Sequence, residues 1–254
     1  MSTNIREVSI MKHYEKLLEL GCFSKNDLEQ ITGSEAAAKW LCREYQKKGY
    51  IERVKRDLYV AISLENQQPI ANRYVIASHI SNDAAVSYHS AFEFYGYSNQ
   101  VFYETQVTSE SRFRDFEYDG VTYRRIAPRI TGGITEINGT RVTTLERTVI
   151  DSVNLFEKIG GLEELLRCLA LIPTLDEATL LACLAEYESG FLYQKTGYIL
   201  STFAGGLGLS DSFFRHVQIA PPERKILFIK REPRLHLARG MEAVCTEKSD
   251  AHDR

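Results

Sequence analysis

Three short helical patterns and a hairpin fill the first sixty residues, and this order constrains the fold more than any other feature of the chain. Ser34 stands at the N-cap position of the third pattern, and Gly49 ends it. Two β-rich runs then flank a polar turn at residues 55–57. The order helix, helix, helix, hairpin predicts a winged helix-turn-helix domain over residues 1–64.

The third predicted helix has two opposite faces. At about 100° per residue, Ala37, Leu41 and Tyr45 fall on an apolar face, and basic side chains fall on the other. The second helix of a helix-turn-helix enters the major groove, where Arg and Gln read base edges and Lys more often meets phosphate. The predicted DNA contacts are Ser34, Lys39, Arg43, Gln46 and Lys47 on the helix, and Arg53, Lys55 and Arg56 on the hairpin.

Other interpretations of this helix stay open. Charges on an exposed face often do no more than solvate it, and a winged helix can serve protein contacts only. Trp40 and Tyr59 are large enough to stack on bases, but aromatic side chains at such positions more often pack inside the domain. Both are therefore predicted to be structural.

The net charge of −3 conceals two basic regions. Residues 39–56 contain seven Lys or Arg and two Glu, and residues 215–239 contain the same numbers. The second region either contacts nucleic acid or an acidic partner, or it keeps the strand-like run at residues 225–230 soluble. This second basic patch comprises Arg215, Arg224, Lys225, Lys230, Arg231, Arg234 and Arg239.

The rest of the chain predicts an α+β domain over residues 72–239, after a polar linker at 65–71 and before a disordered tail at 240–254. Asp119-Gly120 and Asn138-Gly139 are strong hairpin signals, so an antiparallel sheet is expected between helices. The other predicted elements are a helix over 84–95, a strand over 101–108, a helix opened by a Thr143–Glu146 capping box, and a helical part beyond residue 160.

Several segments in this order resemble the AbiEi antitoxin family, the transcriptional-regulator component of abortive-infection, type IV toxin–antitoxin systems. The most specific is Thr144-Leu145-Glu146-Arg147-Thr148-Val149-Ile150-Asp151, which is similar to the family's S/T-x-E-R-T-aliphatic-aliphatic-D helix start. Tyr88-His89-Ser90-Ala91 and the KTGYIL segment beginning at Lys195 are further landmarks, although Phe92 and Tyr97 replace the family's commoner leucines. The resemblance covers roughly residues 5–235 and is loose beyond residue 205.

The resemblance implies a protein that binds inverted repeats in the promoter of its own operon and represses it. It also implies a second partner, a co-encoded nucleotidyltransferase-like toxin, which the antitoxin counteracts without necessarily forming a stable complex. Composition and spacing contribute nothing to this second expectation.

The sequence favours a protein that is not an enzyme. Glu146, Arg147 and Asp151 are explained by helix capping and an i,i+4 ion pair. His79 and His89 have no cysteine or carboxylate at metal-ligand spacing, so both are expected to be packed or hydrogen-bonded. No catalytic residue, cofactor or metal is predicted.

The alternative is a metal-dependent nuclease that uses the winged helix as its DNA anchor. Glu223-Arg224-Lys225 has the E-x-K form that such enzymes use to hold Mg²⁺, but two prolines directly before it disfavour the strand it requires. The five cysteines never form C-x-x-C, and no apolar stretch is long enough for a membrane span. The chain is therefore expected in the cytoplasm.

Overall fold

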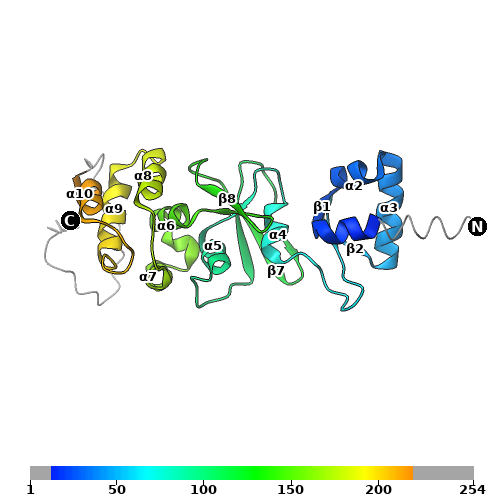
Figure 1. The fold of residues 1–254 in the computed structure, drawn as a ribbon, viewed down its shortest axis with the longest axis horizontal. Helices are drawn as coiled ribbons and strands as arrows, with labels where there is room; N and C mark the ends of the chain where they lie inside the picture. Colours follow the sequence, from blue (N-terminus) through cyan, green and yellow to red (C-terminus); the bar gives the residue numbers. More distant parts are fainter. Residues whose placement is uncertain (1–12, 220–254) are drawn as a thin grey trace, which may run out of the picture. The chain divides into compact units, whose positions relative to one another are not determined.

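Figure 1 shows the computed structural model of this chain, which describes residues 13–219. Residues 13–20 are helical, and a three-stranded antiparallel sheet of order β1-β3-β2 accompanies two further helices. These elements are β1 (Cys22–Ser24), α2 (Lys25–Thr32), α3 (Glu35–Lys48), β2 (Ile51–Lys55) and β3 (Leu58–Ala61).

The ends of α2 and α3 follow the local sequence signals. The Ser24 side chain and Asp27 form a reciprocal capping box at the start of α2. The Ser34 hydroxyl accepts a hydrogen bond from the backbone of Ala37 at 3.2 Å, and Gly49 ends α3 in the left-handed conformation. Helix α3 therefore begins and ends as predicted. The two helices enclose a core of Tyr14, Leu17, Phe23, Leu28, Ala38, Leu41, Tyr45, Ile51 and Ala61.

The second sheet has six strands in the order β6-β7-β5-β4-β9-β8. The two predicted hairpins, β6–β7 and β8–β9, are confirmed, but the expectation of an antiparallel sheet is wrong. β5 pairs with β7 in parallel, and β4 pairs with β9 in parallel, so the sheet is mixed. Its strands are β4 (Ala85–Val86), β5 (Glu104–Thr108), β6 (Phe116–Tyr118), β7 (Val121–Ile126), β8 (Ile134–Ile137) and β9 (Thr140–Thr143).

Helices surround this sheet and continue beyond it, which confirms the α+β class and the helical later part (Figure 1). The largest hydrophobic cluster takes side chains from α5 through α10. The helices are α4 (Arg73–Ser78), α5 (Tyr88–Tyr95), α6 (Leu145–Asn154), the 3-10 turn η1 (Phe156–Ile159), α7 (Leu162–Leu171), α8 (Glu177–Glu186), α9 (Gly190–Ser201) and α10 (Asp211–Ile219).

Two predicted helix starts need correction. The segment expected to be helical from residue 84 first contributes β4, and α5 begins only at Tyr88. The cap of α6 is Thr144, whose hydroxyl accepts from the backbone of Arg147 at 3.3 Å, whereas Thr143 belongs to β9. The carboxylate of Glu146 accepts from the backbone of Asp176 instead of closing a capping box.

The predicted tail at 240–254 lies outside the described residues. Within residues 13–219, no helix combines the length and the apolar character needed to cross a membrane.

Candidate functional site

The outer face of α3 is polar and exposed. Ala38, Leu41 and Tyr45 are at most 2% exposed and hold the inner face against the core. The predicted DNA contacts of this helix all lie on the exposed side: Ser34, Lys39, Arg43, Gln46 and Lys47.

Ion pairs surround the start of α3. Lys39 Nζ lies 2.9 Å from Glu35 Oε1, and Lys25 Nζ reaches the same oxygen at 2.9 Å. Contact with Lys39 and Lys25 lowers the pKa of the exposed Glu35 carboxyl to about 2. The amine of Lys39 is therefore held along the helix by a surface pair that a phosphate can replace at little cost.

The polar side chains in the later half of α3 make fewer contacts within the protein. Within residues 13–219, the side chains of Arg43 and Lys47 make no hydrogen bond or ion pair, and the side chain of Gln46 accepts one contact, from the thiol of Cys42 at 3.4 Å. Trp40 is 54% exposed, so the prediction that it packs inside the domain is wrong. Tyr59 is partly buried and stacks on Phe23, as predicted.

The β2–β3 hairpin places two of its three predicted contacts on the surface. Arg53 and Arg56 are exposed, with Arg53 Nε donating to the carbonyl of Lys55 at 3.1 Å. Lys55 is different, because its Nζ donates to the carbonyl of Ile80 at 3.0 Å and its pKa is lowered by burial. The structure thus holds the Lys55 amine against the protein, whereas Arg53 and Arg56 are exposed.

The second basic patch falls almost entirely outside the described residues. Arg215 is exposed on α10. Glu223 and the remaining basic residues of the patch lie beyond residue 219: Arg224, Lys225, Lys230, Arg231, Arg234 and Arg239.

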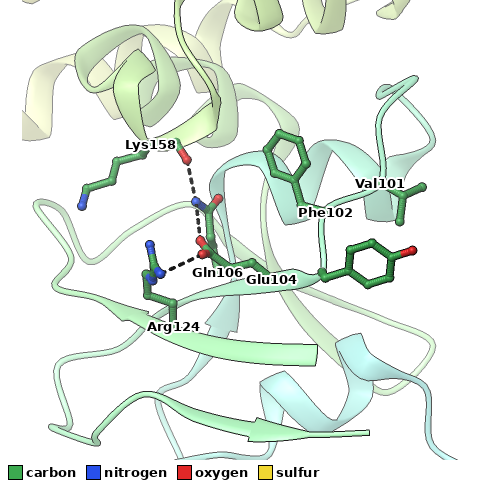
Figure 2. Close-up of a pocket in the computed structure, with 7 residues that line it drawn as sticks. Val101, Phe102, Glu104, Gln106, Arg124 and Lys158 are labelled. Carbon is green, nitrogen blue, oxygen red and sulfur yellow. Dashed lines mark hydrogen bonds and ion pairs between the residues drawn. The ribbon is translucent and has the colours of Figure 1, made fainter. Parts of the chain in front are cut away.

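An open hollow of about 490 Å³ lies at the start of β5 (Figure 2). Tyr103 is 82% exposed and Val101 72% exposed at its edge, and sequence reasoning did not single out either residue. Most of the polar lining is already paired, since Arg124 lies 3.1 Å from Glu104, and the amide of Gln106 donates to the carbonyl of Lys158 at 2.6 Å. This hollow therefore offers apolar surface more than free charge.

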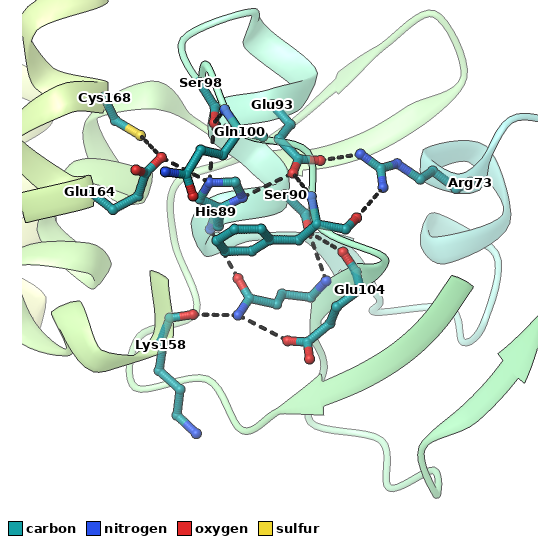
Figure 3. A network of polar contacts seen from close by, with 12 residues as sticks. Arg73, His89, Ser90, Glu93, Ser98, Gln100, Glu104, Lys158, Glu164 and Cys168 are labelled. Carbon is teal, nitrogen blue, oxygen red and sulfur yellow. Dashed lines mark hydrogen bonds and ion pairs between the residues drawn. The ribbon is translucent and has the colours of Figure 1, made fainter. Parts of the chain in front are cut away.

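A buried polar network connects α5 and α7 (Figure 3). His89 Nε2 lies 3.2 Å from Glu164 Oε1, and the thiol of Cys168 lies 3.7 Å from the same oxygen. On its other side, His89 Nδ1 lies 3.0 Å from Glu93 Oε1. The prediction that His89 is packed or hydrogen-bonded is confirmed, but no signal in the sequence indicated that Glu164 and Cys168 lie beside it.

Two of the three residues Glu146, Arg147 and Asp151 pair with each other. Arg147 Nε lies 3.3 Å from Asp151 Oδ2 inside the protein, which confirms the predicted i,i+4 pair. His79 Nδ1 contacts the carbonyl of Val75 at 2.8 Å, as expected for a hydrogen-bonded histidine.

No protein-family model and no curated protein matches this chain. Among solved structures, its fold is similar to that in the crystal structure of the RV2827C protein from Mycobacterium tuberculosis, with a TM-score of 0.52 and 15% sequence identity. The similarity covers 81% of this chain and 78% of that one. At this identity it shows a shared α+β fold and nothing about activity.

Proposed function

We propose that this chain is a DNA-binding antitoxin that represses its own operon and counteracts a co-encoded nucleotidyltransferase-like toxin. In this proposal residues 13–61 form a winged helix-turn-helix, with α3 as the recognition helix and the β2–β3 hairpin as the wing. The protein acts in the cytoplasm, on the promoter DNA of its own operon.

The observation that carries the DNA-binding part is the exposed face of α3. A recognition helix needs a side chain that can reach a base edge without first breaking an internal contact. Arg43 satisfies this condition, since it is exposed and has no partner within residues 13–219. An arginine there can donate two parallel hydrogen bonds to guanine O6 and N7.

The surrounding charges suit phosphate contacts on either side of the groove. Lys39 and Lys47 lie on the same helix, and Arg53 and Arg56 lie on the hairpin. Such contacts position a protein on the duplex, while the base contact gives sequence preference. In this arrangement Lys55 is a packing residue of the wing.

The antitoxin part rests on the family resemblance, above all on the segment 144–151. The structure gives that segment a structural role, because Arg147 and Asp151 are buried together. The DNA-binding and antitoxin parts of the proposal rest on different observations and are tested separately.

The first experiment measures the affinity of purified protein for the DNA upstream of its own gene and for a scrambled duplex of equal length. Arg43→Ala is expected to weaken specific binding by roughly 5- to 150-fold, the value of one bidentate base contact. Arg112→Ala is the matched control, since Arg112 is an exposed arginine outside α3 and the hairpin. Equal affinity of wild type for both duplexes would refute sequence-specific repression.

The second experiment co-expresses the chain with the product of the neighbouring gene and follows growth. Arg43→Ala is expected to release a promoter–reporter fusion from repression while it still rescues growth. Charge reversal at Arg224 and Lys225 tests whether the second basic patch serves either activity. If the neighbouring product is not toxic, or wild type gives no rescue, the antitoxin part is wrong, whatever the DNA result.

A further inference from the structure

The cluster of His89, Glu164 and Cys168 lies away from the proposed DNA interface and has no role in it. His89 is on α5, and Glu164 and Cys168 are one turn apart on α7 (Figure 3). The three residues are 1%, 4% and 0% exposed. Burying two ionisable side chains and a thiol at one point is costly unless something compensates for it.

The spacing of the three ligand atoms matches a tetrahedral metal site. Zn²⁺ binds nitrogen, oxygen and sulfur at about 2.0 to 2.3 Å, so neighbouring ligand atoms stand roughly 3.3 to 3.8 Å apart. The separations are 3.2 Å between His89 and Glu164 and 3.7 Å between Glu164 and Cys168. All three ligand atoms lie within 4.8 Å of one another. A small side-chain movement therefore brings the third separation into the same range.

The surroundings of His89 are those of a metal-bound histidine. Its Nδ1 lies 3.0 Å from Glu93 Oε1, close enough for an ion pair although not aligned for a hydrogen bond, and its Nε2 lies 3.2 Å from Glu164 Oε1. Glu93 is itself held by Arg73 and by the backbone of Phe102. A carboxylate behind one ring nitrogen fixes the tautomer and aims the other nitrogen at the metal.

One carboxylate oxygen of Glu164 lacks a hydrogen-bond partner. Its Oε2 is buried and makes no hydrogen bond, and its nearest cationic neighbour is Arg167 at 3.5 Å. Buried carboxylate oxygens are normally hydrogen-bonded, so this oxygen lacks one hydrogen bond despite its ion pair with Arg167. The other oxygen, Oε1, already faces both His89 and Cys168.

We propose that His89 Nε2, Glu164 and the Cys168 thiolate bind a structural zinc ion that ties α5 to α7. The Ser98 hydroxyl, 3.1 Å from His89 Nε2, or a water held by it, occupies the fourth position. On binding, the S–H bond of Cys168 breaks, its proton leaves to solvent, and a Zn–S bond forms. The two negative ligands then balance the charge of the ion.

The types of ligand atom favour zinc over Mg²⁺ and Ca²⁺. A thiolate with an imidazole and a carboxylate suits zinc, whereas Mg²⁺ and Ca²⁺ prefer oxygen ligands alone. The burial of all three side chains closes the site to a substrate, so the ion has a structural role. The residues at positions 89 and 164 are 75 positions apart, which is why ligand spacing in the sequence gives no sign of them.

The test uses the full chain, purified without a histidine tag and without chelators. Elemental analysis after gel filtration is expected to find about one zinc per chain. Replacement by Co²⁺ is expected to add a thiolate-to-cobalt charge-transfer band. If wild type, supplied with zinc or cobalt, holds neither ion and shows no such band, the proposal is overturned.

Variants of individual residues test where the ion binds. Cys168→Ser is expected to lose the zinc and the cobalt band, while Cys183→Ser, at a buried cysteine on α8, keeps both. Glu93→Gln is expected to keep one zinc per chain but to weaken its affinity by roughly 10- to 100-fold. Far-UV circular dichroism confirms that each variant is folded. Retention of zinc and the cobalt band by folded Cys168→Ser would contradict the assignment, and the wild-type cobalt measurement decides the matter if that variant does not fold.

Discussion

Arg147 is the largest of the fully buried side chains within residues 13–219. Its Nε lies 3.3 Å from Asp151 Oδ2, and its Nη1 donates to the carbonyls of both Thr131 and Gly132. Tyr187 donates its hydroxyl to Asp151 Oδ1. One guanidinium therefore joins α6 to the segment before β8, and its carboxylate partner joins α6 to the end of α8.

We expect Arg147→Met to destabilise the protein by about 3–5 kcal/mol at neutral pH, the cost of leaving one charge of a buried pair without its partner. At 1.4 kcal/mol for each factor of ten, the unfolded population rises by roughly 100- to 4,000-fold. Methionine keeps much of the side-chain volume, so a cavity contributes little of this loss.

The loss of stability in Arg147→Met is expected to grow as the pH rises. Burial raises the pKa of the Asp151 carboxyl above its ordinary 3.8, and Arg147 opposes that rise. Without Arg147, the pKa in the folded state rises further. When folding raises the pKa of a group, the contribution of that group to the stability of the protein is fully present below its pKa in the unfolded chain. That contribution is lost as the pH rises through its pKa in the folded protein. The stability that Arg147→Met loses relative to wild type is therefore larger at neutral pH than at pH values near 3.8.

Urea unfolding followed by far-UV circular dichroism, at neutral and acidic pH, measures this directly. The control is Arg147→Met combined with Asp151→Leu, which removes both charges and is expected to recover most of the stability. A single variant within about 1 kcal/mol of wild type at neutral pH, or a double variant no more stable than the single, would refute the reasoning.

Three further predictions concern other parts of the chain. Ser34→Ala removes the cap of α3 and is expected to cost about 1 kcal/mol in urea unfolding; no change would mean that the cap is dispensable. Gly197→Ala places a Cβ 2.5 Å from Val217 Cγ2, between α9 and α10, and overpacking is expected to cost about 1–3 kcal/mol; equal stability would show that the two helices separate freely. Iodoacetamide is expected to label the partly exposed Cys42 in the folded protein but Cys22 only after unfolding, because burial raises the pKa of Cys22 to about 12; labelling of native Cys22, read by mass spectrometry, would contradict this.

Local signals in the sequence predicted local structure well. Asp119 and Gly120 both have positive φ, as do Asn138 and Gly139, which is the backbone that a two-residue hairpin turn requires. These residue types tolerate that conformation, so four neighbouring residues are enough to identify the turn. The end of α3 at Gly49, which also has positive φ, is predictable for the same reason.

Pairing between distant segments could not be predicted in this way. The parallel β5–β7 and β4–β9 pairs depend on chain crossings that no short window contains. The two-residue strand Ala85–Val86 lies inside an apolar run that also fits a helix, and tertiary pairing decides between the two. These two facts explain both errors in the predicted sheet.

The candidate sites show the same difference between local structure, which the sequence predicts, and tertiary contacts, which it does not. The exposed face of α3 follows from helical periodicity, so seven of the eight predicted contacts lie on the surface. The burial of Lys55 depends on Ile80 and on the rings of Phe113 and Phe116, which lie elsewhere in the chain. The His89 cluster depends likewise on α7. Side chains that meet across tertiary contacts are the part that a single sequence leaves open.

The central claim is that α3 and the hairpin bind DNA through the exposed cations Lys39, Arg43, Lys47, Arg53 and Arg56. Its most direct test is the salt dependence of the affinity of the full chain for the DNA upstream of its own gene. The four proposed phosphate contacts, from Lys39, Lys47, Arg53 and Arg56, predict a slope of about −3.6 in a plot of log affinity against log salt for each bound chain, and a slope smaller by about 1 for Lys47→Ala. A slope near zero, or the same slope in wild type and Lys47→Ala, would contradict the account.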